Sequence, residues 1–194
     1  AHNRGIRVIE DCSQAPGAVV CKNSSDSCDR SCNVWTRRRV GTFGDIAAFS
    51  TMYRKTLTAG ASGGLVYSTD QDIYRQAVAY ADRGRPKWRK NYNSRNPGDA
   101  LFPSLNFNTD EFSCAIGLGS LSRLQNTIDE RCEFVECLCN LLSAESNICR
   151  PYNFHAGFSP FYFPIFVDEE KISCSKGEFS LAVESEGIPL SVHY

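Results

Sequence analysis

Short apolar runs that alternate with helical stretches constrain this chain more than any other feature of its sequence. Three segments read as short strands, each bounded by polar residues or glycine: Val8–Asp11, Asp45–Ser50 and Gly63–Ser68. Apolar residues then recur every three or four positions, which predicts a helix from Thr69 or Asp70 to about Arg83. Strands alternating with helices are typical of an α/β layered fold.

The second half of the chain contains the longest predicted helix. It begins at Thr109 or Asp110, and its apolar stripe continues to about Leu142, with a break allowed at 117–119. The pattern changes after Pro151. Three shorter elements follow, namely a strand at Phe161–Val167, a helix at Lys176–Glu186 and a strand at Ile188–Val192. We therefore expect a large domain over residues 1–150 and the beginning of a smaller one over residues 151–194.

The charge balance excludes two classes of protein. Lys and Arg number 21 against 22 Asp and Glu, which gives a net charge of −1. This balance argues against a protein held on nucleic acid or on anionic lipid by bulk charge. No apolar run approaches the roughly 20 residues of a membrane helix. Because Met52 is the only methionine and Ala1–Gly5 leads directly into the first strand, we expect an interior piece of a longer protein.

Chemically useful side chains follow the first two predicted strands. Asp11 ends the first strand, with Gln14 three residues later; Ser50 ends the second, with Lys55 five residues beyond it. The strand ends of an open α/β sheet form its ligand crevice, which would gather a carboxylate, a hydroxyl and an amine. Each residue taken alone also has a plain structural explanation, such as a loop cap for Asp11 or a solvated surface position for Lys55.

Five stretches of sequence, in this order, resemble the sugar aminotransferases of the DegT/DnrJ/EryC1/StrS family: Val8–Ala15, Val40–Ser50, Lys55–Gly64, Leu105–Gly117, and Glu186–Pro189 with His193-Tyr194. The resemblance implies a pyridoxal-phosphate enzyme of fold type I, like aspartate aminotransferase. Residues 1–150 would be the C-terminal part of its three-layer α/β/α large domain with the interdomain helix. Residues 151–194 would begin the small α+β domain, which is truncated here. Gly63–Ser68 would run antiparallel to its neighbour.

The resemblance also implies a role for each residue at the strand ends. Lys55 would form the Schiff base with pyridoxal phosphate and move the proton during transfer. Asp11 would keep the pyridine nitrogen protonated, and Gln14 would lie beside the ring. Ser50 would donate a hydrogen bond to the cofactor phosphate. Asn106 would reach the phosphate of a partner subunit's cofactor, so that the active sites are completed in a homodimer.

The implied reaction moves an amino group from glutamate or glutamine to a nucleotide-linked keto-sugar. Related dehydratases have histidine in place of the lysine, so Lys55 favours transamination. The sequence departs from the family at Asn108, where arginine is common, and at 51–54, where Thr-Met-Tyr-Arg replaces a frequent Phe-His-Pro-Thr. The alternative is a non-catalytic remnant or a regulatory module of the same fold.

A basic loop follows the first predicted helix. It carries Arg83, Arg85, Lys87, Arg89 and Lys90, with Trp88 and Tyr92 between them. Three interpretations are open: a contact to the diphosphate and base of a nucleotide-sugar through Arg85 and Arg89, a polyanion-binding module over 84–95, or a solvated loop. The resemblance adds His193 as a substrate contact. The net charge of −1 makes the polyanion-binding module, with nucleic acid as its ligand, the weakest of these interpretations.

The cysteines, 10 in all, do not form a metal-binding pattern. Cys21, Cys28 and Cys32 lack the paired short spacings and the fourth ligand of a zinc site, although a disulfide within this loop is open. Cys12, Cys114 and Cys132 occupy positions that suit small buried residues. We expect free thiols and no metal, and the cofactor enzyme that the resemblance implies points to a reducing compartment, the cytoplasm.

Overall fold

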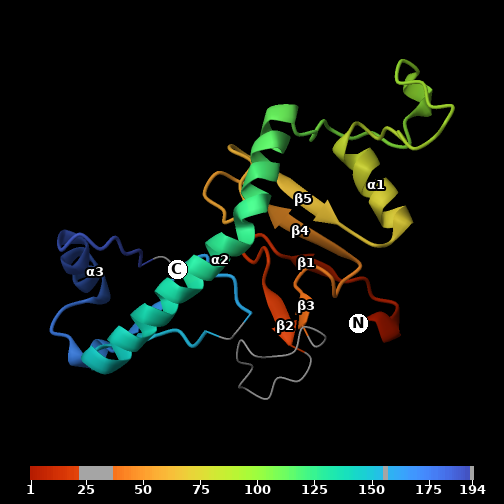
Figure 1. Cartoon of the computed structure of the whole chain (residues 1–194). Helices are drawn as coiled ribbons and strands as arrows, with labels where there is room; N and C mark the ends of the chain where they lie inside the picture. The colour runs from red at the N-terminus through yellow and green to blue at the C-terminus, as the bar shows by residue number, and fades with distance from the viewer. Residues whose placement is uncertain (22–36, 155–156, 193–194) are drawn as a thin grey trace.

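The largest sheet of the protein has three strands. The computed structural model describes residues 1–21, 37–154 and 157–192 (Figure 1). The strand order is β1 (Ile9–Asp11), β4 (Ile46–Ser50) and β5 (Gly64–Tyr67). β1 pairs with β4 in parallel, and β5 pairs with β4 antiparallel. The three predicted strands and the antiparallel direction of the third are thus confirmed.

A two-stranded ribbon, absent from the sequence prediction, lies beside this sheet. β2 (Val19–Cys21) and β3 (Arg37–Arg39) pair antiparallel. The predicted surface loop from Cys21 to Arg39 therefore has strands at its two ends, and residues 22–36 lie outside the described part of the chain. A run of three arginines has no apolar alternation, so this strand owes its existence to backbone pairing across the loop.

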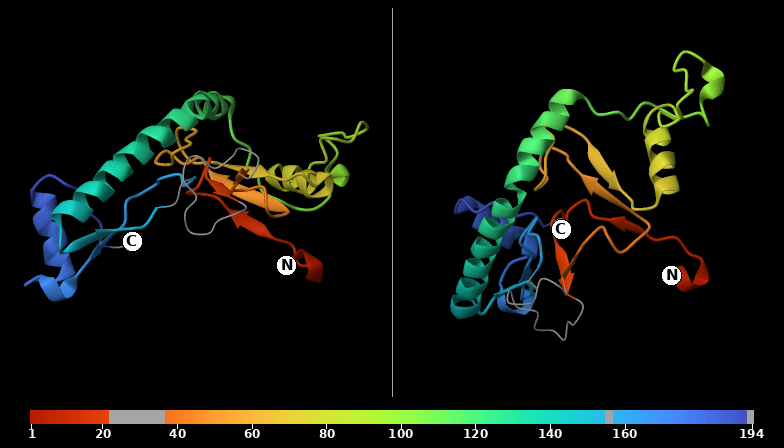
Figure 2. Two further views of the ribbon diagram at one scale, coloured as in Figure 1. Left: turned by 60° about the horizontal axis from the view of Figure 1, so that its bottom comes forward. Right: turned by 45° about the vertical axis from the view of Figure 1, so that its right-hand side comes forward.

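α1 (Gln71–Ala81) begins where its cap predicts. The Asp70 carboxylate accepts hydrogen bonds from the backbone N–H groups of Asp72 and Ile73, which would otherwise lack partners. The segment 84–103 follows and contains one short 3₁₀ turn, Pro97–Asp99. This basic loop projects from the end of α1, on the other side of the sheet from α2 (Figures 1 and 2).

α2 (Glu111–Glu145) connects the two parts of the protein. Its first turns lie beside the sheet, and its last turns reach the C-terminal elements (Figures 1 and 2). The helix is continuous, so the break that the sequence permits at 117–119 does not occur. Ser120, Ile128 and Val135 are buried, about two turns apart on one face. A Cβ on Gly17 would lie 2.5 Å from Ile128 Cδ1, which shows how closely this face approaches the loop after β1.

The C-terminal part consists of a hairpin and a short helix. β6 (Cys149–Pro151) pairs antiparallel with β7 (Ile165–Val167) and packs on α2. The 3₁₀ turn Glu169–Lys171 then leads to α3 (Lys176–Ser185), which begins at a capping box of Ser175 and Glu178. The domain division near Pro151 falls within β6 and stays a prediction.

Two strands predicted in this part are shorter or absent. The strand predicted over Phe161–Val167 begins only at Ile165, because Pro160 and Pro164 have no N–H to give to a ladder. Residues 188–192 form no strand, since no strand pairs with them in the described chain. His193 and Tyr194 lie outside the described residues.

Much of the surface of the three-stranded sheet is exposed to solvent. The accessible surface is 14198 Å², whereas a compact protein of 21.6 kDa exposes about 9,200 Å². Apolar strand residues contribute to the excess: Ile9 is 74% exposed and Val66 is 57% exposed. The three-layer arrangement is therefore partial in this chain, in agreement with the fold class expected from the sequence.

The cysteines whose side chains the structure describes are seven in number, and all of them are free thiols in varied environments. Cys12 is fully buried, as expected, and Cys132 is half-buried. Cys114 is exposed, so the expectation of a buried position was wrong there. None of the helices within the described ranges is both long and apolar enough to span a bilayer.

Candidate active site

The ends of two parallel strands form the base of the candidate site. Asp11 is the last residue of β1 and Ser50 is the last residue of β4. Because β1 and β4 are parallel, with Asp11 opposite Ala48, both carboxyl ends lie at the same edge of the sheet. The Cys12 N–H donates to the Ala48 carbonyl at 2.8 Å and extends this pairing by one residue.

Lys55 lies on the turn that joins β4 to β5. The N–H of Thr51 donates to the Gly63 carbonyl at 2.9 Å, and the N–H of Lys55 donates to the Met52 carbonyl at 2.9 Å. Thr51 is buried, and a Cβ on Gly63 would lie 2.8 Å from its Oγ1. Glycine is therefore required at 63 by the closeness of the two strands of this turn. The Lys55 side chain is half-buried.

The positive charge of the Lys55 amine affects the ionisation of the Asp11 carboxylate. Hydrogen bonds from the Ser13 side chain and N–H, followed by the positive charge of Lys55, lower the pKa of Asp11. The Ser13 N–H lies 3.0 Å from Asp11 Oδ1. Asp11 is therefore an anion at neutral pH, and Lys55 lies on its side of the sheet, near enough for its charge to be felt.

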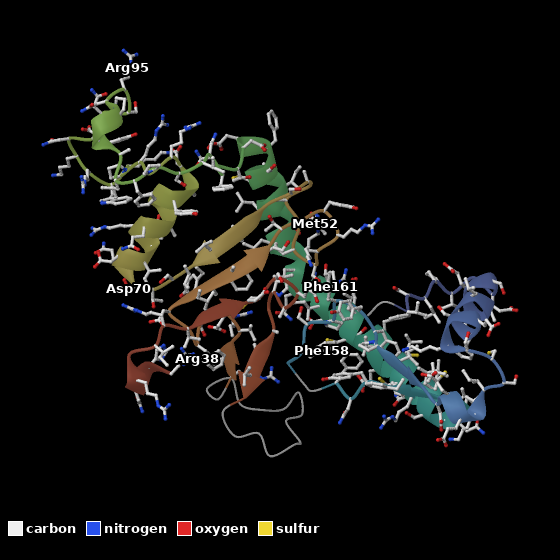
Figure 3. The ribbon with its side chains drawn as sticks, turned by 180° about the vertical axis from the view of Figure 1, so that it is seen from behind. Arg38, Met52, Asp70, Arg95, Phe158 and Phe161 are labelled. Carbon is white, nitrogen blue, oxygen red and sulfur yellow. The ribbon has the colours of Figure 1, made fainter. Side chains whose placement is uncertain are left out.

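A segment from the C-terminal part covers these groups. Lys55 Nζ lies 4.4 Å from the centre of the Phe161 ring, a cation–π contact. The neighbouring Tyr162 hydroxyl donates to Gln14 Oε1 at 2.8 Å. Figure 3 labels Met52, in the turn that carries Lys55, and Phe161, in the C-terminal part. The segment 157–162, hereafter the covering segment, thus contacts both the lysine turn and the loop after β1.

Further hydrogen bonds attach the covering segment to the loop after β1. The hydroxyl of Ser159, which is 4% exposed, donates to the Pro16 carbonyl at 2.8 Å. The N–H of Val19 donates to the Gly157 carbonyl at 2.7 Å. Residues separated by more than 130 positions in the sequence are therefore joined around Gln14.

The sequence assigns Arg85, Arg89 and Asn106 to substrate or cofactor contacts. No contact of these three residues with Lys55 occurs in the described part of the chain. Arg85 points back to the buried carboxylate of Asp82 at 3.6 Å, and Arg89 is exposed in the same basic loop. Arg95, at the tip of that loop, lies far from Phe161 in Figure 3. Asn106 is exposed and forms an antiparallel β-bridge with Asp82, the C-cap residue of α1. His193 lies outside the described residues, so its role stays a prediction.

Three residues beside the candidate site are not predicted from the sequence, namely Phe161, Tyr162 and Arg131. The sequence pattern predicts the two aromatic residues as the start of a strand. Pro160 and Pro164 on either side of them were the available signal, since prolines are confined to strand edges and loops. Arg131 gives no sequence signal, because a charged residue on a long helix ordinarily faces solvent.

The side chains at the sheet edge fit pyridoxal phosphate. The cofactor requires an amine for its aldehyde, an anion for its ring nitrogen and donors for its phosphate. Lys55 is suited to the first and the ionised Asp11 to the second, while the Ser50 hydroxyl at the end of β4 is suited to the third. Across the described ranges, no group of three or more histidine, cysteine or acidic side chains is arranged to hold a metal ion.

Comparison with known proteins agrees with this arrangement. The chain is 28% identical over 136 residues to GDP-perosamine synthase of Escherichia coli O157:H7, which covers 70% of this chain and 31% of the synthase. It superimposes on an aminotransferase from Psychrobacter cryohalolentis with a TM-score of 0.77 at 21% identity, over 97% of this chain and 48% of that one.

A third similar structure is the Escherichia coli GDP-4-keto-6-deoxy-D-mannose-3-dehydratase with bound hydrated PLP. Its TM-score is 0.70 at 19% identity, over 96% of this chain and 46% of the dehydratase. The chain thus spans less than half the length of these three proteins. The model of the DegT/DnrJ/EryC1/StrS aminotransferase family matches residues 1–194. This chain, with its lysine turn and its ionised aspartate at one sheet edge, therefore belongs to the DegT/DnrJ/EryC1/StrS aminotransferase family.

Proposed function

We propose that this chain belongs to a pyridoxal-phosphate aminotransferase that acts on a nucleotide-linked keto-sugar. The observation that carries the proposal is the geometry of the sheet edge, where Asp11 and Ser50 end the parallel strands β1 and β4 and Lys55 lies on the turn that follows β4. The names of relatives support the substrate class, since one of them is a GDP-perosamine synthase. Glutamate or glutamine is the proposed amino donor, whose amino group replaces the keto oxygen of the sugar.

The cofactor, when bound, supplies an aldehyde for the Schiff base and a ring that withdraws electrons from the reacting carbon. Lys55 would hold the cofactor through its amine and would carry the reacting proton at Nζ. Asp11 keeps a proton on the ring nitrogen because its own pKa is lowered. Gln14 orients the ring, and its side chain is in turn held by Tyr162. Ser50 donates to the phosphate.

The proposal includes a homodimer and a cytoplasmic location. The tip of the basic loop at Arg95 lies far from Phe161 in Figure 3, and Asn106 and Arg85 both contact Asp82 at the base of that loop, which suits contacts to a partner's cofactor and substrate. His193 is included as a substrate contact. The free thiols agree with a reducing compartment. Lys55 itself favours transamination over the dehydratase reaction of the third similar structure.

The test is a visible absorbance band in the longest available form of the protein incubated with pyridoxal phosphate. We expect the band in the wild type, its loss in Lys55→Ala and its retention in Lys176→Ala, which removes an exposed lysine of α3. Borohydride reduction should attach the cofactor to the peptide that contains Lys55. Absence of the band from the wild type would refute the proposal and favour a non-catalytic remnant.

A further inference from the structure

One guanidinium nitrogen joins the lysine turn to the covering segment. Arg131, half-buried on α2, donates from NH1 to Thr56 Oγ1 at 2.8 Å and to the Pro160 carbonyl at 3.1 Å. This nitrogen carries two hydrogens, so it can satisfy both acceptors at once. The three groups come from segments that are distant in the sequence and meet only at this point.

Each acceptor lies next to a residue of the candidate site. Thr56 is 8% exposed and follows Lys55 directly, while Pro160 is buried and precedes Phe161. The contact between the Lys55 amine and the Phe161 ring is thus bracketed by two hydrogen bonds to one side chain. One of these hydrogen bonds is to the side chain that follows Lys55, and the other is to the backbone carbonyl that precedes Phe161.

α2 is suited to act as the fixed support. It also receives the lysine turn at a second point, where the Thr58 N–H donates to Ser120 Oγ at 3.1 Å. Ser120 and Arg131 lie three turns apart on one continuous helix, so the turn is attached to a rigid element at both places. In the described part of the chain, Arg131 forms no ion pair with a carboxylate within 4.0 Å, and its charge serves the two neutral acceptors.

We propose that Arg131 is a positioning residue for Lys55, acting through Thr56 and Pro160 to hold the amine beneath the Phe161 ring. This inference rests on the proposed function of Lys55 as the cofactor lysine. Loss of the guanidinium lets the lysine turn and the covering segment separate, so the amine samples more orientations and captures the cofactor aldehyde more slowly.

Four variants test the inference in the longest available form of the protein. Arg131→Met removes the donors and keeps much of the stem, Arg131→Lys keeps the charge without the planar fork, and Thr56→Val removes one acceptor at nearly equal volume. The matched control is Arg123→Met, an exposed arginine of the same helix. Thermal unfolding of each variant checks that it is folded.

The first readout is the rate at which Lys55 captures pyridoxal phosphate, measured by borohydride trapping and peptide mass spectrometry. We expect Arg131→Met to slow capture on the order of tenfold, as when an oriented group loses its support. Arg131→Lys and Thr56→Val should give smaller losses, and Arg123→Met none. Adding Thr56→Val to Arg131→Met should have little further effect, because both remove the same hydrogen bond.

The second readout needs no cofactor. Reductive methylation with ¹³C labels the Lys55 amine, whose methyl signal should be shifted upfield by the Phe161 ring current and assigned by its loss in Lys55→Arg. The upfield shift should shrink in Arg131→Met and persist in Arg123→Met. An unchanged shift and an unchanged capture rate in folded Arg131→Met would overturn the inference. If the wild type captures no cofactor, the proposed function fails, and the methyl shift still decides the role of Arg131.

Discussion

The buried hydrogen bond of Ser159 offers a direct measure of how firmly the covering segment is attached. Ser159→Ala removes the hydroxyl that lies 2.8 Å from the Pro16 carbonyl, at a position where the serine is 4% exposed. No other donor of the described residues reaches this carbonyl. The variant therefore leaves a buried acceptor unpaired, while the loss of one oxygen atom creates little cavity.

The expected cost is about 1–3 kcal/mol, the desolvation penalty of an unpaired buried carbonyl. The matched control is Ser185→Ala on α3, which removes a hydroxyl that donates to the Ala182 carbonyl at 2.6 Å on an exposed surface. Water can replace that donor, so the control should stay within about 0.5 kcal/mol of the wild type. The two variants thus differ in burial and share the chemistry of the deleted bond.

The assay is urea unfolding of the longest available form of the protein, combined with amide hydrogen exchange. Exchange should accelerate at the Val19 N–H, which donates to Gly157 in the same covering segment. Equal unfolding free energies for Ser159→Ala and Ser185→Ala, with unchanged exchange at Val19, would refute the reasoning. The covering segment would then owe its attachment to packing alone.

Two further predictions concern the backbone and the pH response. Gly84→Ala should cost about 2–5 kcal/mol in chemical unfolding, because φ is +72° and a Cβ would collide with the Phe102 carbonyl; Gly5→Ala, with φ of +69° and open space around it, should cost only about 1–2 kcal/mol. The pKa of Asp45 is lowered to about 2 by the Val8 N–H and then by basic side chains. Its contribution to stability is therefore present above about pH 4 and is lost as the pH falls toward 2. The urea concentration at the unfolding midpoint should fall less steeply with decreasing pH in Asp45→Asn than in the wild type over that window. A slope equal to that of the wild type would contradict this assignment.

Local signals determined where the helices begin. Asp70, Asp110 and Ser175 each cap a helix through their own side chains, and such caps act within three residues of chain. The break that the sequence permits at 117–119 does not occur, because tertiary packing outweighs the local preference of the glycines there. A glycine in a helix costs about 1 kcal/mol, and α2 offsets that cost by packing on β6 and by contacts of Ser120 and Ile128 with the N-terminal part.

Strands were predicted less well because a strand needs a partner that the local sequence does not specify. Ile188–Val192 has a suitable composition and no pairing strand in the described chain. Arg37–Arg39 has an unsuitable composition and forms β3, because Val19–Cys21 lies beside it. Hydrogen-bond ladders are made between segments, so residue type alone leaves them undecided.

The sequence by itself determined the chemical groups of the candidate site and the strand ends on which they lie. Asp11, Ser50 and Lys55 follow strands whose carboxyl ends must meet once β1 and β4 are parallel. Tertiary structure alone decided what surrounds them. Phe161 over the lysine amine and Arg131 between Thr56 and Pro160 are contacts between distant segments, set by how α2 and the covering segment fold back on the sheet edge. No local pattern encodes such contacts, because their free energy exists only when the chain has folded.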